Sequence, residues 1–66
     1  MNVMVNGNPM ELPEGLTIDG LLARLNVRRE YTAVAVNREV TPKHQYAQSV
    51  LRDGDRVEIV RPMGGG

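Results

Sequence analysis

Only one segment of this 66-residue chain has the spacing of an amphipathic helix. Its apolar positions, at i, i+3, i+4 and i+7, are Ile18, Leu21, Leu22 and Leu25. They predict one buried face on a helix of about ten residues, with Thr17 as N-cap and Asp19 favourably placed in the first turn. Gly20 lacks a side chain and is expected to let the helix lie close to a sheet. A single helix that must cover every strand predicts a two-layer α+β domain.

The first residues alternate in a way that is typical of a half-buried strand. Val3 and Val5 are apolar at every second position, with less apolar neighbours between them. Asn6-Gly7 is a strong hairpin signal, because both residues tolerate positive φ. A short second strand follows around Met10 and is flanked by prolines, which suits the edge of a sheet.

Three more strands are expected after the helix. The apolar run at residues 33–36 predicts a strand covered on both faces, or nearly so. A tight turn near Asn37-Arg38 leads to a short fourth strand. The turn Asp53-Gly54-Asp55 leads to the last strand, where Val57 and Ile59 face one way. The side chains predicted to face the other way are Arg56, Glu58 and Val60.

Together these elements predict the β-grasp, or ubiquitin-like, fold. The sheet would be mixed and four- to five-stranded, with one main helix on one face. We divide the chain into a β-grasp domain, residues 1–61, and a flexible C-terminal tail, residues 62–66, because a terminal glycine run orders poorly.

Composition argues against several classes of function. Eight acidic and eight basic residues cancel, whereas binding a phosphate backbone requires a basic face. The chain has no cysteine, no apolar run long enough to span a bilayer and no recognisable secretory signal. We expect a cytoplasmic protein that binds neither nucleic acid nor membrane.

No side chain stands out as catalytic. His44 is the single histidine and Ser49 lacks a nucleophile motif, so both are interpreted as structural or surface residues. Asp53 and Asp55 lack the further ligands of a calcium loop and are explained by turn chemistry. We therefore predict no catalytic residue, no metal site and no bound cofactor.

The C-terminal sequence PMGGG is the best candidate for chemistry. From Pro62 the chain can extend by about 17 Å. Gly64 and Gly65 could thread a narrow channel in a partner and deliver the Gly66 carboxylate, which a partner enzyme would have to activate with MgATP. The alternative is a frayed end or a linker. The predicted docking residues on the sheet face away from the helix are Met4, Glu58, Val60 and Met63, although isolated exposed Val and Met are also normal.

The whole chain resembles the ThiS family, the ubiquitin-like sulfur carriers of thiamine biosynthesis. The matching segments are VNG, EGLTIDGLL, AVAVNREVTPKHQYAQ, LRDGDRVEIV and the terminal Gly-Gly. Tyr46 stands where similar proteins often have tryptophan, and there are three final glycines where two are needed. If Gly66 were an addition, the working terminus would be Gly65.

The resemblance implies a carrier that is acted on by enzymes and is not itself an enzyme. A ThiF-like adenylyltransferase, similar to ubiquitin-activating enzymes, would adenylate the Gly66 carboxylate. A sulfur donor system would convert it to a thiocarboxylate, and a ThiG-like thiazole synthase would accept the sulfur. The alternatives are the small subunit of molybdopterin synthase, another ubiquitin-like carrier or modifier, and a β-grasp interaction module without chemistry.

Overall fold

The computed structural model describes residues 1–61, and the predicted tail, residues 62–66, lies outside the described part. The strands are β1 (Asn2–Val5), β2 (Asn8–Glu11), β3 (Ala33–Val36), β4 (Glu39–Thr41) and β5 (Arg56–Val60). The helix α1 spans Ile18–Arg24, and two 3-10 turns, η1 (Arg29–Tyr31) and η2 (Lys43–Gln45), lie in the connections.

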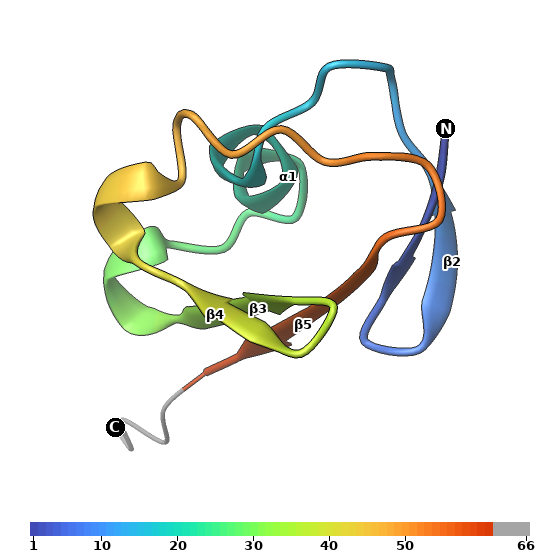
Figure 1. Ribbon diagram of the computed structural model, residues 1–66. Helices are drawn as coiled ribbons and strands as arrows, with labels where there is room; N and C mark the ends of the chain where they lie inside the picture. The colour runs from blue at the N-terminus through green and yellow to red at the C-terminus, as the bar shows by residue number, and fades with distance from the viewer. Residues whose placement is uncertain (62–66) are drawn as a thin grey trace.

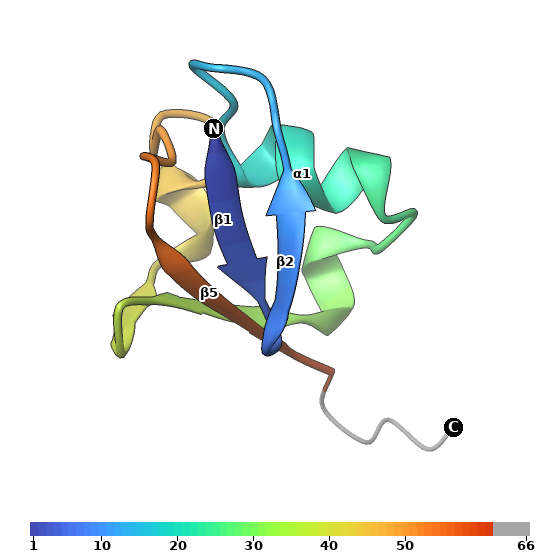
Figure 2. The same ribbon diagram turned by 90° about the vertical axis from the view of Figure 1, so that its right-hand side faces the viewer.

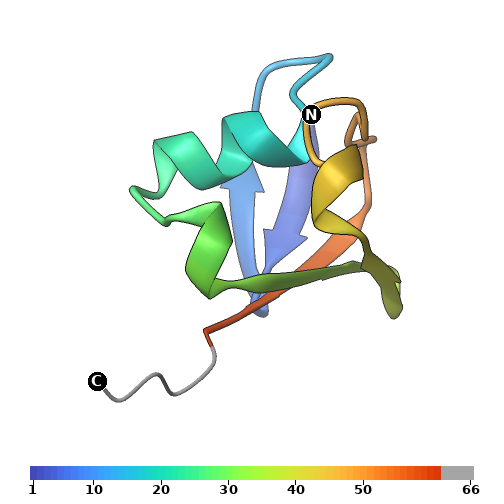
Figure 3. The same cartoon turned by 90° about the vertical axis from the view of Figure 1, so that its left-hand side faces the viewer.

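The strands form one mixed five-stranded sheet in the order β2-β1-β5-β3-β4. β1 and β5 run parallel, and the other neighbouring pairs are antiparallel. α1 lies across one face of this curved sheet (Figure 1). α1 lies with η1 and η2 in front of the strands in Figure 3 and behind them in Figure 2. The predicted β-grasp arrangement is confirmed, including β2 at an edge.

Both predicted hairpin turns are present. Asn6 and Gly7 have φ values of 50° and 83°, and Asn37 and Arg38 have values of 52° and 72°. Two successive residues with positive φ are the signature of a type I′ turn, whose twist matches that of the flanking strands. The register that follows places Val3 opposite Met10 and Ala35 opposite Val40.

α1 begins as predicted but is shorter, with 7 residues instead of about ten. The Gly20 N–H donates to Thr17 Oγ1 at 3.1 Å, which confirms the N-cap. The helix ends because Asn26 adopts a left-handed conformation, with φ of 57°. The N–H groups of Asn26 and Val27 then donate to the carbonyls of Ala23 and Leu22. This is a Schellman motif with asparagine in the place of the usual glycine.

The reason expected for Gly20 is wrong. A Cβ at this position would lie 2.6 Å from Leu16 Cδ1 and 3.5 Å from Thr17 Oγ1, and none of its nearest neighbours belongs to the sheet. The absence of a side chain at Gly20 therefore makes room for Leu16, in the loop that enters the helix. Leu16 in turn packs against the core.

The core lies between α1 and the inner face of the sheet. Its buried residues are Val3, Val5, Leu12, Ile18, Leu21, Leu22, Val34, Tyr46, Leu51 and Val57. Tyr46 is only 1% exposed, so the segment after η2 closes one side of the core. The expectation that residues 33–36 are covered on both faces is wrong, because Ala33 is exposed and only Val34 is fully buried.

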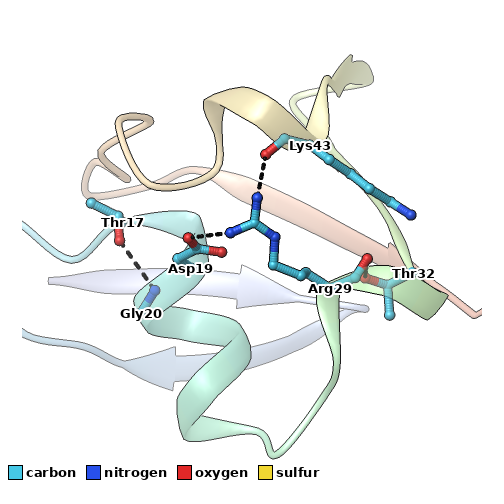
Figure 4. Close-up of polar contacts among 6 residues, drawn as sticks. All are labelled: Thr17, Asp19, Gly20, Arg29, Thr32 and Lys43. Carbon is cyan, nitrogen blue, oxygen red and sulfur yellow. Dashed lines mark hydrogen bonds and ion pairs between the residues drawn. The ribbon is translucent and has the colours of Figure 1, made fainter.

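Arg29 links the two connections that contain η1 and η2 to the helix α1. Figure 4 shows Arg29 reaching Asp19 on α1, at 3.0 Å, and the Lys43 carbonyl on η2, at 3.2 Å. Its guanidinium carbon also lies 5.9 Å from the centre of the Tyr46 ring. One guanidinium thus links α1, η1 and η2, which all lie on the same side of the sheet.

The core predicts a sharp difference between two substitutions on α1. Leu21→Ala removes a fully buried side chain and should cost about 2–5 kcal/mol. A domain of this size has a total stability of about 3–10 kcal/mol. Arg24→Ala, on the exposed side of the same helix, should change stability by less than about 0.5 kcal/mol. Urea denaturation followed by circular dichroism measures both, and equal losses would contradict the assigned core.

Candidate functional site

The outer face of the sheet is the surface that α1 leaves uncovered. In β5 the side chains of Val57 and Ile59 point to the core side, whereas those of Arg56, Glu58 and Val60 are exposed, as predicted. Strand pairing extends this outer row across the sheet. Ala35 lies opposite Glu58, and Ala33 lies opposite Val60.

We define the outer-face patch as Ala33, Ala35, Val40, Glu58 and Val60. Val40 lies opposite Ala35 in the β3–β4 hairpin and is 74% exposed, and Val60 is 59% exposed. Apolar side chains from three adjacent strands therefore lie on the same face as the carboxylate of Glu58. Such a surface suits a partner that has an apolar contact area and a basic or hydrogen-bonding group opposite Glu58.

The three predicted docking residues that the structure describes do not form one cluster. Glu58 and Val60 belong to the outer-face patch. Met4 is exposed on the same face, as predicted, but its partner in the pairing is Arg56, at the opposite end of β5 from Val60. Strand geometry separates Arg56 from Val60 by about 13 Å. Met63 lies outside the described residues.

Sequence reasoning missed Val40, the most exposed large apolar side chain of the described residues. The run of residues 33–36 is apolar at every position, so it does not show which face points outward. The turn at Asn37-Arg38 carried the missing information, because a two-residue hairpin fixes the register that pairs residue 35 with residue 40.

The other polar candidates have structural explanations. His44 is exposed on η2, and Ser49 is half-buried in the loop before Val50. Asp53 Oδ1 accepts a hydrogen bond from the Asn2 N–H at 2.7 Å, and Asp55 Oδ2 accepts one from the Arg52 N–H at 2.8 Å. The bond to Asp55 stabilises the turn from within, and the bond to Asp53 ties the same turn to the start of β1.

The described part of the chain offers little for catalysis. Among residues 1–61, no group of three or more His, Asp or Glu side chains could hold a metal ion. An open groove on the helix side is lined chiefly by Val5, Met10, Leu25, Val27 and Ile59, together with Asn6, Asn8 and Arg61. Its lining includes neither a nucleophile nor a general base.

The chain leaves the sheet at Arg61, which is exposed and directly follows Val60. The outer-face patch therefore ends next to the point from which the segment 62–66 departs. The predicted roles of Gly64, Gly65 and Gly66 fall outside the described residues. None of the helices in residues 1–61 is long and apolar enough to cross a membrane.

Among the proteins that resemble this chain over its full length are two whose own chains are also covered completely. The crystal structure of the thiamine biosynthesis protein ThiS from Geobacter metallireducens has a TM-score of 0.86 and 39% identity, with complete coverage of both chains. The sulfur carrier protein ThiS of Escherichia coli is 32% identical over 66 residues, again covering both chains completely.

A further relative is much longer than this chain. The thiazole synthase of Paramagnetospirillum magneticum is 39% identical over 66 residues, and the chain spans only 20% of its length. The model of the ThiS family matches residues 3–66, which include the last glycine. Because this match covers nearly the whole sequence and the fold agrees, the chain belongs to the ThiS family.

Proposed function

We propose that the Gly66 carboxylate is adenylated, converted to a thiocarboxylate and used to deliver sulfur for thiazole formation. The broader function follows from family membership: the chain is a sulfur carrier protein of thiamine biosynthesis and not a catalytic enzyme. The observation that carries the proposal is the family match, which continues through the glycine segment to residue 66.

The chemistry requires an activating enzyme because a carboxylate is a poor electrophile. Attack of a Gly66 oxygen on the α-phosphate of ATP forms an acyl-adenylate and releases pyrophosphate. The terminal sulfur of a persulfide then attacks the acyl carbon, and AMP leaves. A thiol reduces the resulting acyl disulfide to the thiocarboxylate. MgATP, the persulfide and the thiol belong to the partner enzymes.

Glycine suits the delivery of such a group. A residue without Cβ can lie in a narrow channel and approach a bound nucleotide closely. Gly64 and Gly65 would occupy the channel, and Gly66 would place its acyl carbon at the nucleotide. The partner for this step is an adenylyltransferase that resembles ubiquitin-activating enzymes, of the ThiF-like type.

The second partner is a ThiG-like thiazole synthase that accepts the sulfur. This is supported by the similarity between this chain and a fifth of the length of a protein named thiazole synthase. A ThiS-like segment and a thiazole synthase within one protein are expected if the two act in consecutive steps. A thiocarboxylate is also a soft nucleophile, suited to transferring sulfur to a carbon electrophile.

The outer-face patch is the proposed docking surface for the adenylyltransferase. It combines exposed apolar side chains on β3, β4 and β5 with the carboxylate of Glu58. Because β5 leads directly to Arg61, a partner bound over Val60 would have the departing segment at its surface. Docking and delivery would then both use the same end of β5.

Mass spectrometry tests the chemical step. With the adenylyltransferase, MgATP and a persulfide source, the intact chain should first gain the mass of an adenylate and then show replacement of one oxygen by sulfur. A chain without Gly66 shows which glycine is the reactive terminus. If that chain is still adenylated, Gly65 can serve; if it is not, the reaction requires Gly66. A wild-type chain that acquires neither modification from a competent enzyme would refute the proposal.

A pair of matched substitutions tests the docking surface. Val60→Lys places a charge in the outer-face patch and should weaken binding to the adenylyltransferase by roughly ten-fold. Val50→Lys makes the same change at a side chain of similar exposure, 54% against 59%, beside the N-terminus of α1. It should leave the Kd within about two-fold, since it lies outside the patch. Isothermal titration calorimetry measures both, and equal effects would exclude the patch as the docking surface.

A further inference from the structure

The side chain of Asn6 is bound to the backbone of β5 near its end. The Ile59 N–H donates to Asn6 Oδ1 at 2.8 Å, and Asn6 Nδ2 donates to the Ile59 carbonyl at 3.3 Å. The Asn6 N–H also donates to the Val57 carbonyl at 2.9 Å. One residue in the first turn therefore makes three hydrogen bonds to the last strand.

These hydrogen bonds continue the pairing along β5 beyond the point where β1 ends. The parallel pairing of β1 with β5 ends at Val5 and Val57, since the chain reverses at Asn6. On the other side of β5, Asn37 and Arg56 form a hydrogen-bonded pair. Such pairs alternate along an antiparallel ladder, so Ile59 faces Val34 as a non-hydrogen-bonded pair. The Ile59 N–H and carbonyl thus point toward the β1 side, where the Asn6 side-chain amide hydrogen-bonds to both.

We propose that Asn6 is a positioning residue for the C-terminal reaction, an inference that rests on the proposed function. The Asn6 amide keeps the end of β5 in the sheet, so that the chain leaves the domain at Arg61. Without this amide, the residues from Ile59 onward can detach from the sheet and lengthen the connection between the domain and Gly66. More conformations then compete with the one in which Gly66 reaches the nucleotide, so fewer docked complexes react.

Asn37 provides a matched control at the other end of the same strand. The Arg56 N–H donates to Asn37 Oδ1 at 3.0 Å, and Asn37 Nδ2 donates to Asp55 Oδ1 at 3.0 Å. Asn37 also has positive φ in a two-residue turn, as Asn6 does. Glycine tolerates that conformation, so Asn6→Gly and Asn37→Gly each remove an amide and preserve the turn.

Amide hydrogen exchange tests the structural part of the proposal. In Asn6→Gly the Ile59 amide should exchange roughly ten-fold faster, since its hydrogen bond is lost while the central pairs of the sheet remain. In Asn37→Gly its exchange rate should stay at the wild-type value after correction for global stability. Equal exchange of this amide in both variants would overturn the proposal.

Adenylation kinetics test the functional part. Asn6→Gly should lower kcat for adenylation at saturating carrier by roughly five-fold, because fewer docked complexes place Gly66 at the nucleotide. It should also raise KM, because the end of β5 that detaches includes Val60 of the outer-face patch. Asn37→Gly should retain the wild-type kcat. Asn6→Asp keeps the acceptor for the Ile59 N–H and loses the donor to its carbonyl, so its kcat should be intermediate.

The two proposals fail in different ways. If the wild-type chain is adenylated and both glycine variants have the same kcat, Asn6 has no positioning role and the sulfur carrier chemistry stands. If the wild-type chain is not adenylated, the proposed chemistry fails, and hydrogen exchange at Ile59 still decides whether Asn6 holds the end of the strand.

Discussion

The pairing of β1 with β5 is the contact on which the rest of the structure depends. It joins the two ends of the described chain side by side in the middle of the sheet. Each of the two strands carries a hairpin partner or an antiparallel neighbour on its other side, and the inner faces of both contribute buried valines to the core. Removing this pairing would leave two separate halves, neither of which could bury α1.

The elements that the sequence predicts well are those determined by neighbouring residues. Asn6-Gly7 and Asn37-Arg38 specify their turns through local φ preferences, and Thr17 caps α1 through a contact three residues away. The alternation along β5 predicts correctly which residues face outward. These features need no knowledge of the rest of the fold.

Three other features could not be predicted in this way. The helix ends early because Asn26 adopts positive φ, which asparagine permits but does not require. Gly20 makes room for Leu16. From the sequence alone, a glycine within a helix does not show which neighbouring residue occupies the space. Val40 can be assigned to the same patch as Glu58 and Val60 only when the register of β3, β4 and β5 is known. The candidate docking surface is therefore a property of the assembled sheet.

The central position of β5 also affects how the protein is made. During synthesis β5 emerges from the ribosome after the other four strands of the described sheet. Because β5 lies between β1 and β3, these two strands cannot be joined into one sheet before β5 is available. The β1–β2 and β3–β4 hairpins can form locally, but the contacts that unite them span most of the chain and close last. A chain that has not completed its core therefore lacks a formed end of β5. The central placement of β5 therefore couples the formation of this strand end to the completion of the core.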